Sequence, residues 1–239
     1  MARKETSEQL CKRIAEKSNG VCIISFSMGK DSIAAYLQAK KHFHTIHLVY
    51  YYMIPDLQFQ KQSLRYYEQK FGQRILEFPS VHLYTQLNGC MYQTPDRLDT
   101  LWDLNIYEAN HDEIFAAAKS DLGVPQETYV GLGVRSSDSL NRRMSIDTYG
   151  AENIQRRQFF PIFDWNIADI EQSIKAADVR LPIDYEIWGR SFDGVQMSFL
   201  EGVRHHFPED YKKILEWFPL AEMDFLRYRD YADYNPFNV

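Results

Sequence analysis

The chain has 239 residues, of which 45% are hydrophobic and 25% are charged, and its formal net charge is −6 at pH 7. These values are typical of a globular protein with a sizeable core, and they exclude a disordered or fibrous class. The sequence has no long Lys/Arg run, so direct nucleic-acid binding is not indicated, although a local basic pocket is not excluded. No apolar run approaches the roughly 18 residues that span a bilayer, so we expect no membrane contact and a cytoplasmic location.

The three cysteines are widely spaced and form no CxxC pair; they are Cys11, Cys22 and Cys90. Cys22 belongs to the most apolar strand of the chain. A structural zinc site or a disulfide framework is therefore not expected.

Apolar spacing and stop signals predict the first elements. A helix is expected over residues 6–18, because Leu10, Ile14 and Ala15 recur at helical spacing before the stop at Asn19-Gly20. The next predictions, in chain order, are a strand over 21–26, a helix over 33–41, a strand over 45–51, a helix over 57–71 and a short strand over 74–78.

The second half is less regular. Residues 80–110 contain the breakers Asn88-Gly89 and Pro95, with a short helix predicted at 98–104. Asn110 is expected to cap a helix whose apolar face uses Ile114, Ala117 and Ala118 and which ends at Gly123. Further predictions are strands over 128–132 and 159–162, a helix over 137–146, and mostly helical structure over 167–231. Strands that alternate with helices predict an α/β fold, with a parallel twisted sheet of about five strands and helices on both faces.

The loop that follows the first predicted strand is the most informative segment. It reads SFSMGKDS over residues 25–32 and opens the next helix. N–H groups at a helix start have no intrahelical partner and lie at the positive end of the helix dipole, so they can receive an anion. The spacing differs from both the Walker A motif and GxGxxG. The loop resembles the S-G-G-x-D-S PP-loop of the ATP pyrophosphatase superfamily, and most closely S-F-S-G-G-K-D-S of the phosphoadenosine phosphosulfate (PAPS) reductase branch.

The chemistry of the loop residues suits phosphate. Ser27 and Ser32 can offer hydroxyl groups, Gly29 lets the backbone come close, and Lys30 places a positive charge nearby. Asp31 repels phosphate unless it caps the helix, holds the loop or binds Mg²⁺. With the start of the loop included, the expected nucleotide-binding residues here are Ser25, Ser27, Gly29, Lys30, Asp31 and Ser32.

Met28 departs from the resemblance, which has glycine at this position. If the position requires a positive φ, Met28 carries a strain of about 1–2 kcal/mol, and its side chain narrows the cradle. The alternative interpretation of the whole loop is a plain strand-to-helix turn.

A second segment supports the resemblance. It reads GLGVRSSDSLNR over residues 131–142 and is similar to the family pattern G-[IL]-R-x-x-x-S-x-x-R. Gly133, Arg135 and Arg142 match it, so the resemblance implies phosphate contacts there. The family often has a second arginine where this chain has Ser136. The alternative for Arg142 is a solvated helix face.

A third segment, PIFDWNIADI over 161–170, also matches the family. Here Asp164 and Asn166 are expected to cap the following helix, while Trp165 packs in the core. The resemblance implies a PP-loop domain over 21–195, between an N-terminal helix at 1–20 and a helical C-terminal tail at 196–239 packed on the domain or on a partner.

The resemblance implies an adenine nucleotide, ATP with Mg²⁺, cleaved between its α- and β-phosphates to adenylate an unknown acceptor. Lys30 and Arg135 are then the catalytic candidates and Asp31 the metal ligand. The alternatives are a PAPS reductase-like enzyme, for which the reductases' tail cysteine is missing unless Cys90 replaces it, and a non-catalytic nucleotide-binding subunit.

Three aromatic or histidine groups have weaker claims. One ring of Tyr50-Tyr51-Tyr52 would stack on adenine, or the three pack at a strand end. His205 and His206 are expected to be surface or packing residues. Aromatic residues of the tail are expected to dock it or to form a homo-oligomer or partner contact; they are Tyr228, Tyr231, Tyr234 and Phe237.

Overall fold

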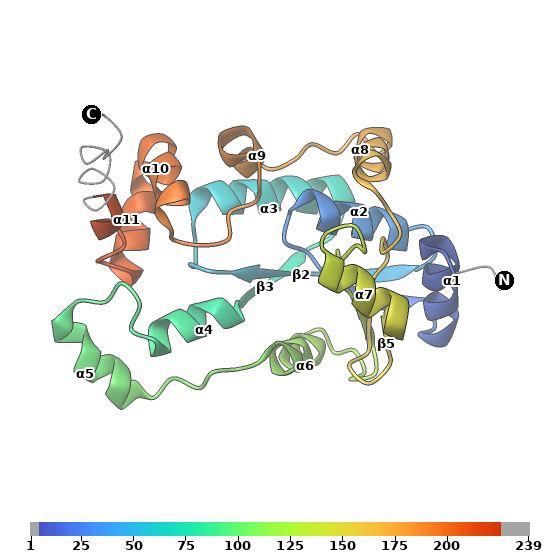
Figure 1. The fold of residues 1–239 in the computed structure, drawn as a ribbon, viewed down its shortest axis with the longest axis horizontal. Helices are drawn as coiled ribbons and strands as arrows, with labels where there is room; N and C mark the ends of the chain where they lie inside the picture. Colours follow the sequence, from blue (N-terminus) through green and yellow to red (C-terminus); the bar gives the residue numbers. More distant parts are fainter. Residues whose placement is uncertain (1–4, 226–239) are drawn as a thin grey trace. The chain divides into compact units, whose positions relative to one another are not determined.

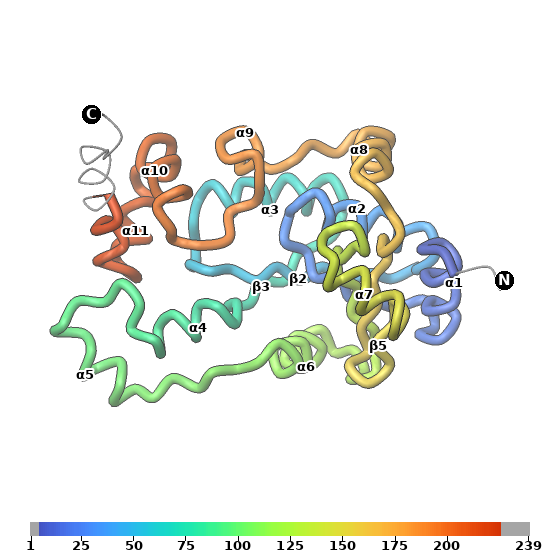
Figure 2. Tube along the Cα trace, viewed as in Figure 1, coloured from blue at the N-terminus to red at the C-terminus, as the bar shows by residue number. Residues whose placement is uncertain are grey.

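The computed structural model describes residues 5–225, and the account below concerns these residues. They form two compact units, and the chain passes between them several times (Figure 2). The first unit contains the chain up to Tyr51, Leu64–Phe78 and Asn110–Pro182. The second contains Tyr52–Ser63, Pro79–Ala109 and the described residues from Ile183 onward. The tail aromatics from Tyr228 onward lie outside the described residues.

A six-stranded sheet organises the fold, with the order β3-β2-β1-β4-β6-β5. β1 pairs in parallel with β2 and β4, and β4 pairs in parallel with β6. β5 runs antiparallel to β6. The predicted α/β class is thus confirmed, with a short antiparallel edge strand that the sequence did not predict. The strands are β1 Val21–Ser25, β2 Thr45–Tyr52, β3 Ile75–Pro79, β4 Tyr129–Gly131, β5 Glu152–Asn153 and β6 Gln158–Phe159.

Helices lie on both faces of the sheet, as predicted: Figure 1 shows α6 on one side, with α2 and α8 on the other. On the α6 side, Ile23, Val49 and Val130 pack against Phe115 and Ala118. Ala117, predicted on this apolar face, is exposed. The helices centred on the first unit are α1 Ser7–Lys17, α2 Lys30–Ala39, α6 His111–Asp121, α7 Leu140–Tyr149 and α8 Ile167–Ala176, and α3 Gln58–Phe71 runs through both units.

Side-chain caps fix several helix starts. Thr6 and Asn110 each form a capping box, with Gln9 and Glu113 respectively, in which the cap and the third helical residue exchange hydrogen bonds. These local signals explain why α1 and α6 lie close to their predicted bounds.

The prediction of an irregular segment at 80–110 is wrong for its first part, where the second unit contains the helix α4 Val81–Asn88. Ser80 caps it by accepting a hydrogen bond from the Leu83 N–H. Leu83 is the one fully buried residue of α4, and with Leu87, which packs beside it four residues later, it gives the helix an apolar face of about two turns, too short for a clear signal in the sequence. Asn88-Gly89 ends this helix. The remaining helices of this unit are α5 Pro95–Leu104, α9 Ile183–Trp188, α10 Met197–His206 and α11 Pro208–Trp217.

An apolar core of its own holds the second unit together. Phe59 stacks on Phe207 with a ring-centroid distance of 4.9 Å and lies in a cluster with Phe199 and Leu200 of α10. The buried Asp210 accepts hydrogen bonds from the first N–H groups of α3. Within residues 5–225, none of the helices has the length and apolarity required to cross a membrane.

Candidate functional site

The loops after β1 and β4 leave the same edge of the sheet. These two strands are parallel neighbours, and the chain continues from β1 to β2 on one side, while β4 lies on the other. The strand order therefore reverses between β1 and β4. In open α/β sheets, ligands bind outside the carboxyl ends of the strands at such a switch point.

Hydroxyl groups shape the loop between β1 and α2. The Ser27 Oγ accepts from the Gly29 N–H at 3.4 Å and donates to the Ser32 Oγ at 3.3 Å, and the Ser32 Oγ donates to the Gly29 carbonyl at 2.9 Å. Gly29 is the N-cap of α2 and supplies no side-chain hydrogen bond to it. The N-cap residue therefore provides no side-chain cap at this positive end of the helix dipole. The phosphate contacts of Ser25, Ser27, Gly29 and Ser32 stay predictions.

Met28 occupies a left-handed backbone position, with φ +60°, as its replacement of glycine suggested. Its side chain is 1% exposed, so it is buried in the protein instead of standing free in the loop. The left-handed conformation costs a non-glycine residue about 1–2 kcal/mol. The loop therefore keeps a left-handed backbone conformation that favours glycine, and the Met28 backbone is strained in it.

Gly133 brings the β4 loop against the start of α2. A Cβ atom at this position would lie 2.9 Å from the carbonyl carbon and oxygen of Asp31 and 3.0 Å from the Ser32 nitrogen. These are backbone atoms and cannot rotate away. Glycine is required here because two backbone segments meet. The absence of a side chain at Gly133 lets the loop after β4 lie against the first turn of α2.

Five charged residues form an alternating chain across the two loops. The Asp31 carboxylate lies 3.1 Å from the Lys30 Nζ and 2.9 Å from the Arg135 Nε. The Asp138 carboxylate lies 2.7 Å from the Arg135 Nη2 and 2.7 Å from the Arg142 Nη1. With three cations and two carboxylates, these five residues have a formal net charge of +1.

The two arginines of this chain differ in exposure. Arg135 is 6% exposed and also donates from Nη1 to the Ser137 Oγ at 3.2 Å, so every guanidinium nitrogen faces a protein group. Its Nε contact with Asp31 is an ion pair that is not aligned as a hydrogen bond. The Arg142 side chain is 51% exposed and lies in the first turn of α7. Arg142 is therefore the more accessible cation, whereas Arg135 lies in the wall.

Asp138 lies in the candidate site, and the sequence interpretation missed it. It accepts hydrogen bonds from the Arg135 N–H and from the Arg142 side chain. Its position between the two matched arginines is the available signal, but residues 135–139 precede α7, so the pairing depends on the turn and not on helical spacing.

The described residues do not supply a metal site by themselves. No group of three His, Cys, Asp or Glu side chains within 5–225 is arranged to hold a metal ion. Each oxygen of Asp31 already faces a cation. A role for Asp31 as a Mg²⁺ ligand would require nucleotide phosphates to supply further oxygens.

The tyrosine candidates are packed in the protein, whereas the histidine candidates lie on its surface. Tyr50 is buried, and Tyr51 packs edge-on against Phe115 with a ring-centroid distance of 5.8 Å. These positions favour the strand-end interpretation over adenine stacking. His205 and His206 are exposed on α10.

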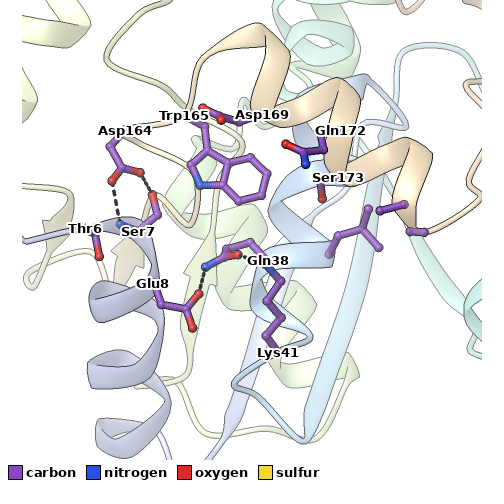
Figure 3. Close-up of a pocket in the computed structure, with 13 residues that line it drawn as sticks. Thr6, Ser7, Glu8, Gln38, Lys41, Asp164, Trp165, Asp169, Gln172 and Ser173 are labelled. Carbon is purple, nitrogen blue, oxygen red and sulfur yellow. Dashed lines mark hydrogen bonds between the residues drawn. The ribbon is translucent and has the colours of Figure 1, made fainter.

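The third segment differs from its prediction. Asn166 caps α8, but Asp164 instead accepts hydrogen bonds from the backbone N–H and hydroxyl group of Ser7 at the start of α1. Trp165 is half-buried and lines a cavity of about 690 Å³ between α1, α2 and α8, with the Lys41 Nζ 5.8 Å from its ring centroid (Figure 3). The predicted phosphate-binding residues do not line this cavity.

No family model matches the chain, and no curated protein matches it. The crystal structure of PAPS reductase from Candida auris, a phosphate complex, is similar with a TM-score of 0.51 and 12% identity, over 80% of this chain and 88% of that chain. The U34-tRNA thiolase NcsA from Methanococcus maripaludis, with its 4Fe–4S cluster, has a TM-score of 0.44 and 12% identity, over 90% of this chain and 79% of that chain. At 12% identity, the likeness to PAPS reductase is one of fold alone. This likeness agrees with the α/β fold predicted from the sequence.

Proposed function

We propose that the chain binds an adenine nucleotide at the switch point between β1 and β4, and that it cleaves ATP between the α- and β-phosphates to adenylate an acceptor. The observation that supports this most directly is the start of α2, whose N-cap Gly29 supplies no side-chain hydrogen bond and which lies beside the cations of both loops. The fold that the chain shares with PAPS reductase supports a nucleotide by analogy.

In this proposal the phosphates lie over the first turn of α2. The backbone N–H groups and Lys30 bind the departing pyrophosphate, whose negative charge grows as the bond to the α-phosphorus breaks. Arg142 contacts the phosphates from the rim. Arg135 contributes its charge from the wall of the site, where Asp31 and Asp138 hold it.

Mg²⁺ would neutralise phosphate charge when it is bound with the nucleotide, and Asp31 is the carboxylate placed to meet it. The Asp31 carboxylate lies 3.1 Å from the Lys30 Nζ. A phosphate bound at the start of α2 would therefore compete with this carboxylate for the Lys30 ammonium group. Binding would thereby release one carboxylate oxygen of Asp31 from its ion pair.

The test is release of pyrophosphate from ATP. The Lys30→Ala variant should lower the rate at least about 100-fold, the size of effect seen when one transition-state donor is removed. Circular dichroism checks that the variant is folded. Lys40→Ala, a lysine at the other end of α2, is the matched control and should retain the rate. Absence of pyrophosphate release with amine, thiol, carboxylate and nucleic-acid acceptors would contradict the enzymatic part of the proposal.

A second candidate is nucleotide binding without turnover. The strained Met28 and the buried, ion-paired Arg135 favour it, because both make the loop less free to rearrange around a transition state. Calorimetry that shows ATP binding, with no release of pyrophosphate under any of these conditions, would select this candidate.

A PAPS reductase-like reaction requires a thiolate nucleophile. Burial raises the pKa of Cys11 to about 12 and that of Cys22 well above its ordinary value, so neither is a reactive thiol. Cys90, half-buried in the second unit, is then the remaining thiol of this chain. Thiol-dependent sulfite release from PAPS that disappears in Cys90→Ser would establish this alternative.

A further inference from the structure

We infer that Asp138 is a positioning residue of the phosphate site, which fixes Arg135 in the wall and holds Arg142 at the exposed rim where it meets the phosphates. This inference rests on the proposed function, because it concerns the same site. It explains why a carboxylate, Asp138, lies in a site that is proposed to bind negatively charged phosphates.

The Asp138 carboxylate accepts two hydrogen bonds and forms one further ion pair. The Asp138 Oδ2 accepts from the Arg135 backbone N–H at 2.9 Å and from the Arg142 Nη1 at 2.7 Å, and the Oδ1 lies 2.7 Å from the Arg135 Nη2. The Asp138 N–H donates back to the Arg135 carbonyl at 3.3 Å, which closes the turn. The side chain of Asp138 is 16% exposed, so solvent screens these contacts only in part. Charge-assisted hydrogen bonds of this length are the strong ones in proteins.

The first turn of α7 explains why such a residue is needed. It carries Arg142 and Arg143 and no acidic residue, so cations lie at the positive end of the helix dipole. That arrangement is unfavourable unless a negative charge lies near. Asp138, which directly precedes the N-cap Ser139, supplies this charge and keeps Arg142 in one place before a ligand arrives.

Bulk electrostatics and positioning predict opposite signs for the same substitution. Asp138→Asn keeps the size of the side chain and raises the net charge of the five-residue cluster from +1 to +2. Charge alone would then tighten anion binding. If Asp138 positions the arginines, the substitution instead weakens binding, because Arg142 must be ordered at the moment of binding.

The experiment is calorimetric titration of the full chain with ATP and, separately, with pyrophosphate. Asp138→Asn should raise the Kd for both probes about tenfold. Asp147→Asn removes the same charge from a later turn of α7 and should leave both Kd values within about twofold. Arg142→Gln should also weaken binding, and the double variant with Asp138→Asn should lose less than the product of the two single effects, because Asp138 acts partly through Arg142.

The outcomes separate this inference from the proposed function. Wild-type protein that binds neither probe overturns both. Wild-type binding with an unchanged or lower Kd in Asp138→Asn overturns the inference alone, as does a lower Tm of this variant without a change in Kd. If Asp138→Asn does not fold, Asp138→Glu replaces it, because the added methylene displaces the carboxylate by about 1.5 Å while keeping its charge. Asp138→Glu should weaken binding of both probes as well, and unchanged binding would overturn the inference.

Discussion

At the scale of single residues, Met28 makes two opposing contributions to the free energy of unfolding: its backbone strain lowers it, and the burial of its side chain raises it. Its left-handed φ costs about 1–2 kcal/mol. Its side chain is fully buried, and removal of a buried methionine side chain costs about 2–5 kcal/mol. Burial is the larger contribution, so Met28→Gly should lower the free energy of unfolding by about 2 kcal/mol although it restores the residue of the resembled motif. Urea denaturation measures this difference.

A matched variant separates the two contributions. Met28→Leu keeps the strained φ and nearly the same apolar volume, so its free energy of unfolding should stay within about 1.5 kcal/mol of wild type. A Met28→Gly protein more stable than wild type would show that backbone strain dominates, and would contradict the packing argument.

At the scale of elements, Glu152 of β5 attaches α1 to the edge of the sheet. It pairs with Arg13 and Lys17 of α1 and accepts a hydrogen bond from the Tyr129 hydroxyl group at 2.6 Å. Burial raises the pKa of Glu152, but hydrogen bonds from Arg13, Tyr129 and Lys17 outweigh burial and bring it from an ordinary 4.5 to about 2. Since the folded pKa lies below the unfolded one, the stabilisation is complete above about pH 4.5 and is lost as the pH falls toward 2.

Glu152→Gln should therefore lower the free energy of unfolding by about 2 kcal/mol at neutral pH, discounted for its partly exposed cations. The difference from wild type should shrink between pH 4.5 and 2, as followed by urea titrations at each pH. Glu5→Gln is the control, because Glu5 also pairs with Arg13 but is 37% exposed, and it should change stability by less than about 1 kcal/mol. A Glu152→Gln difference that is constant with pH would contradict the argument.

The elements also show what the sequence could predict. α1 and α6 were predicted closely, because their apolar spacing coincides with local caps. β5 has two residues and, within residues 5–225, pairs with β6 alone, so nothing in its own sequence indicates a strand. The same distinction holds at the site: the loop at 25–32 was visible as a local motif, whereas the Asp31–Arg135 ion pair depends on strand order and required the structure.

At the scale of the whole molecule, each of the two units described in residues 5–225 has its own hydrophobic packing, and this division determines how a ligand stabilises the chain. Ile23, Val49 and Val130 belong to the core of the first unit, whereas Phe199 and Ile214 belong to that of the second. The candidate site is built from residues of the first unit. A ligand stabilises what it binds by about 2.7 kcal/mol at 100 times its Kd.

We therefore expect ATP at that concentration to slow amide hydrogen exchange in β1 and β4 by up to about 100-fold, with little change in α10 and α11. Mass spectrometry of peptic fragments with and without ATP measures both regions in one sample. Lys30→Ala protein under the same conditions is the control and should show less protection in β1 and β4. Equal protection of both units would contradict the prediction, because it would mean that the two cores open together as one cooperative body.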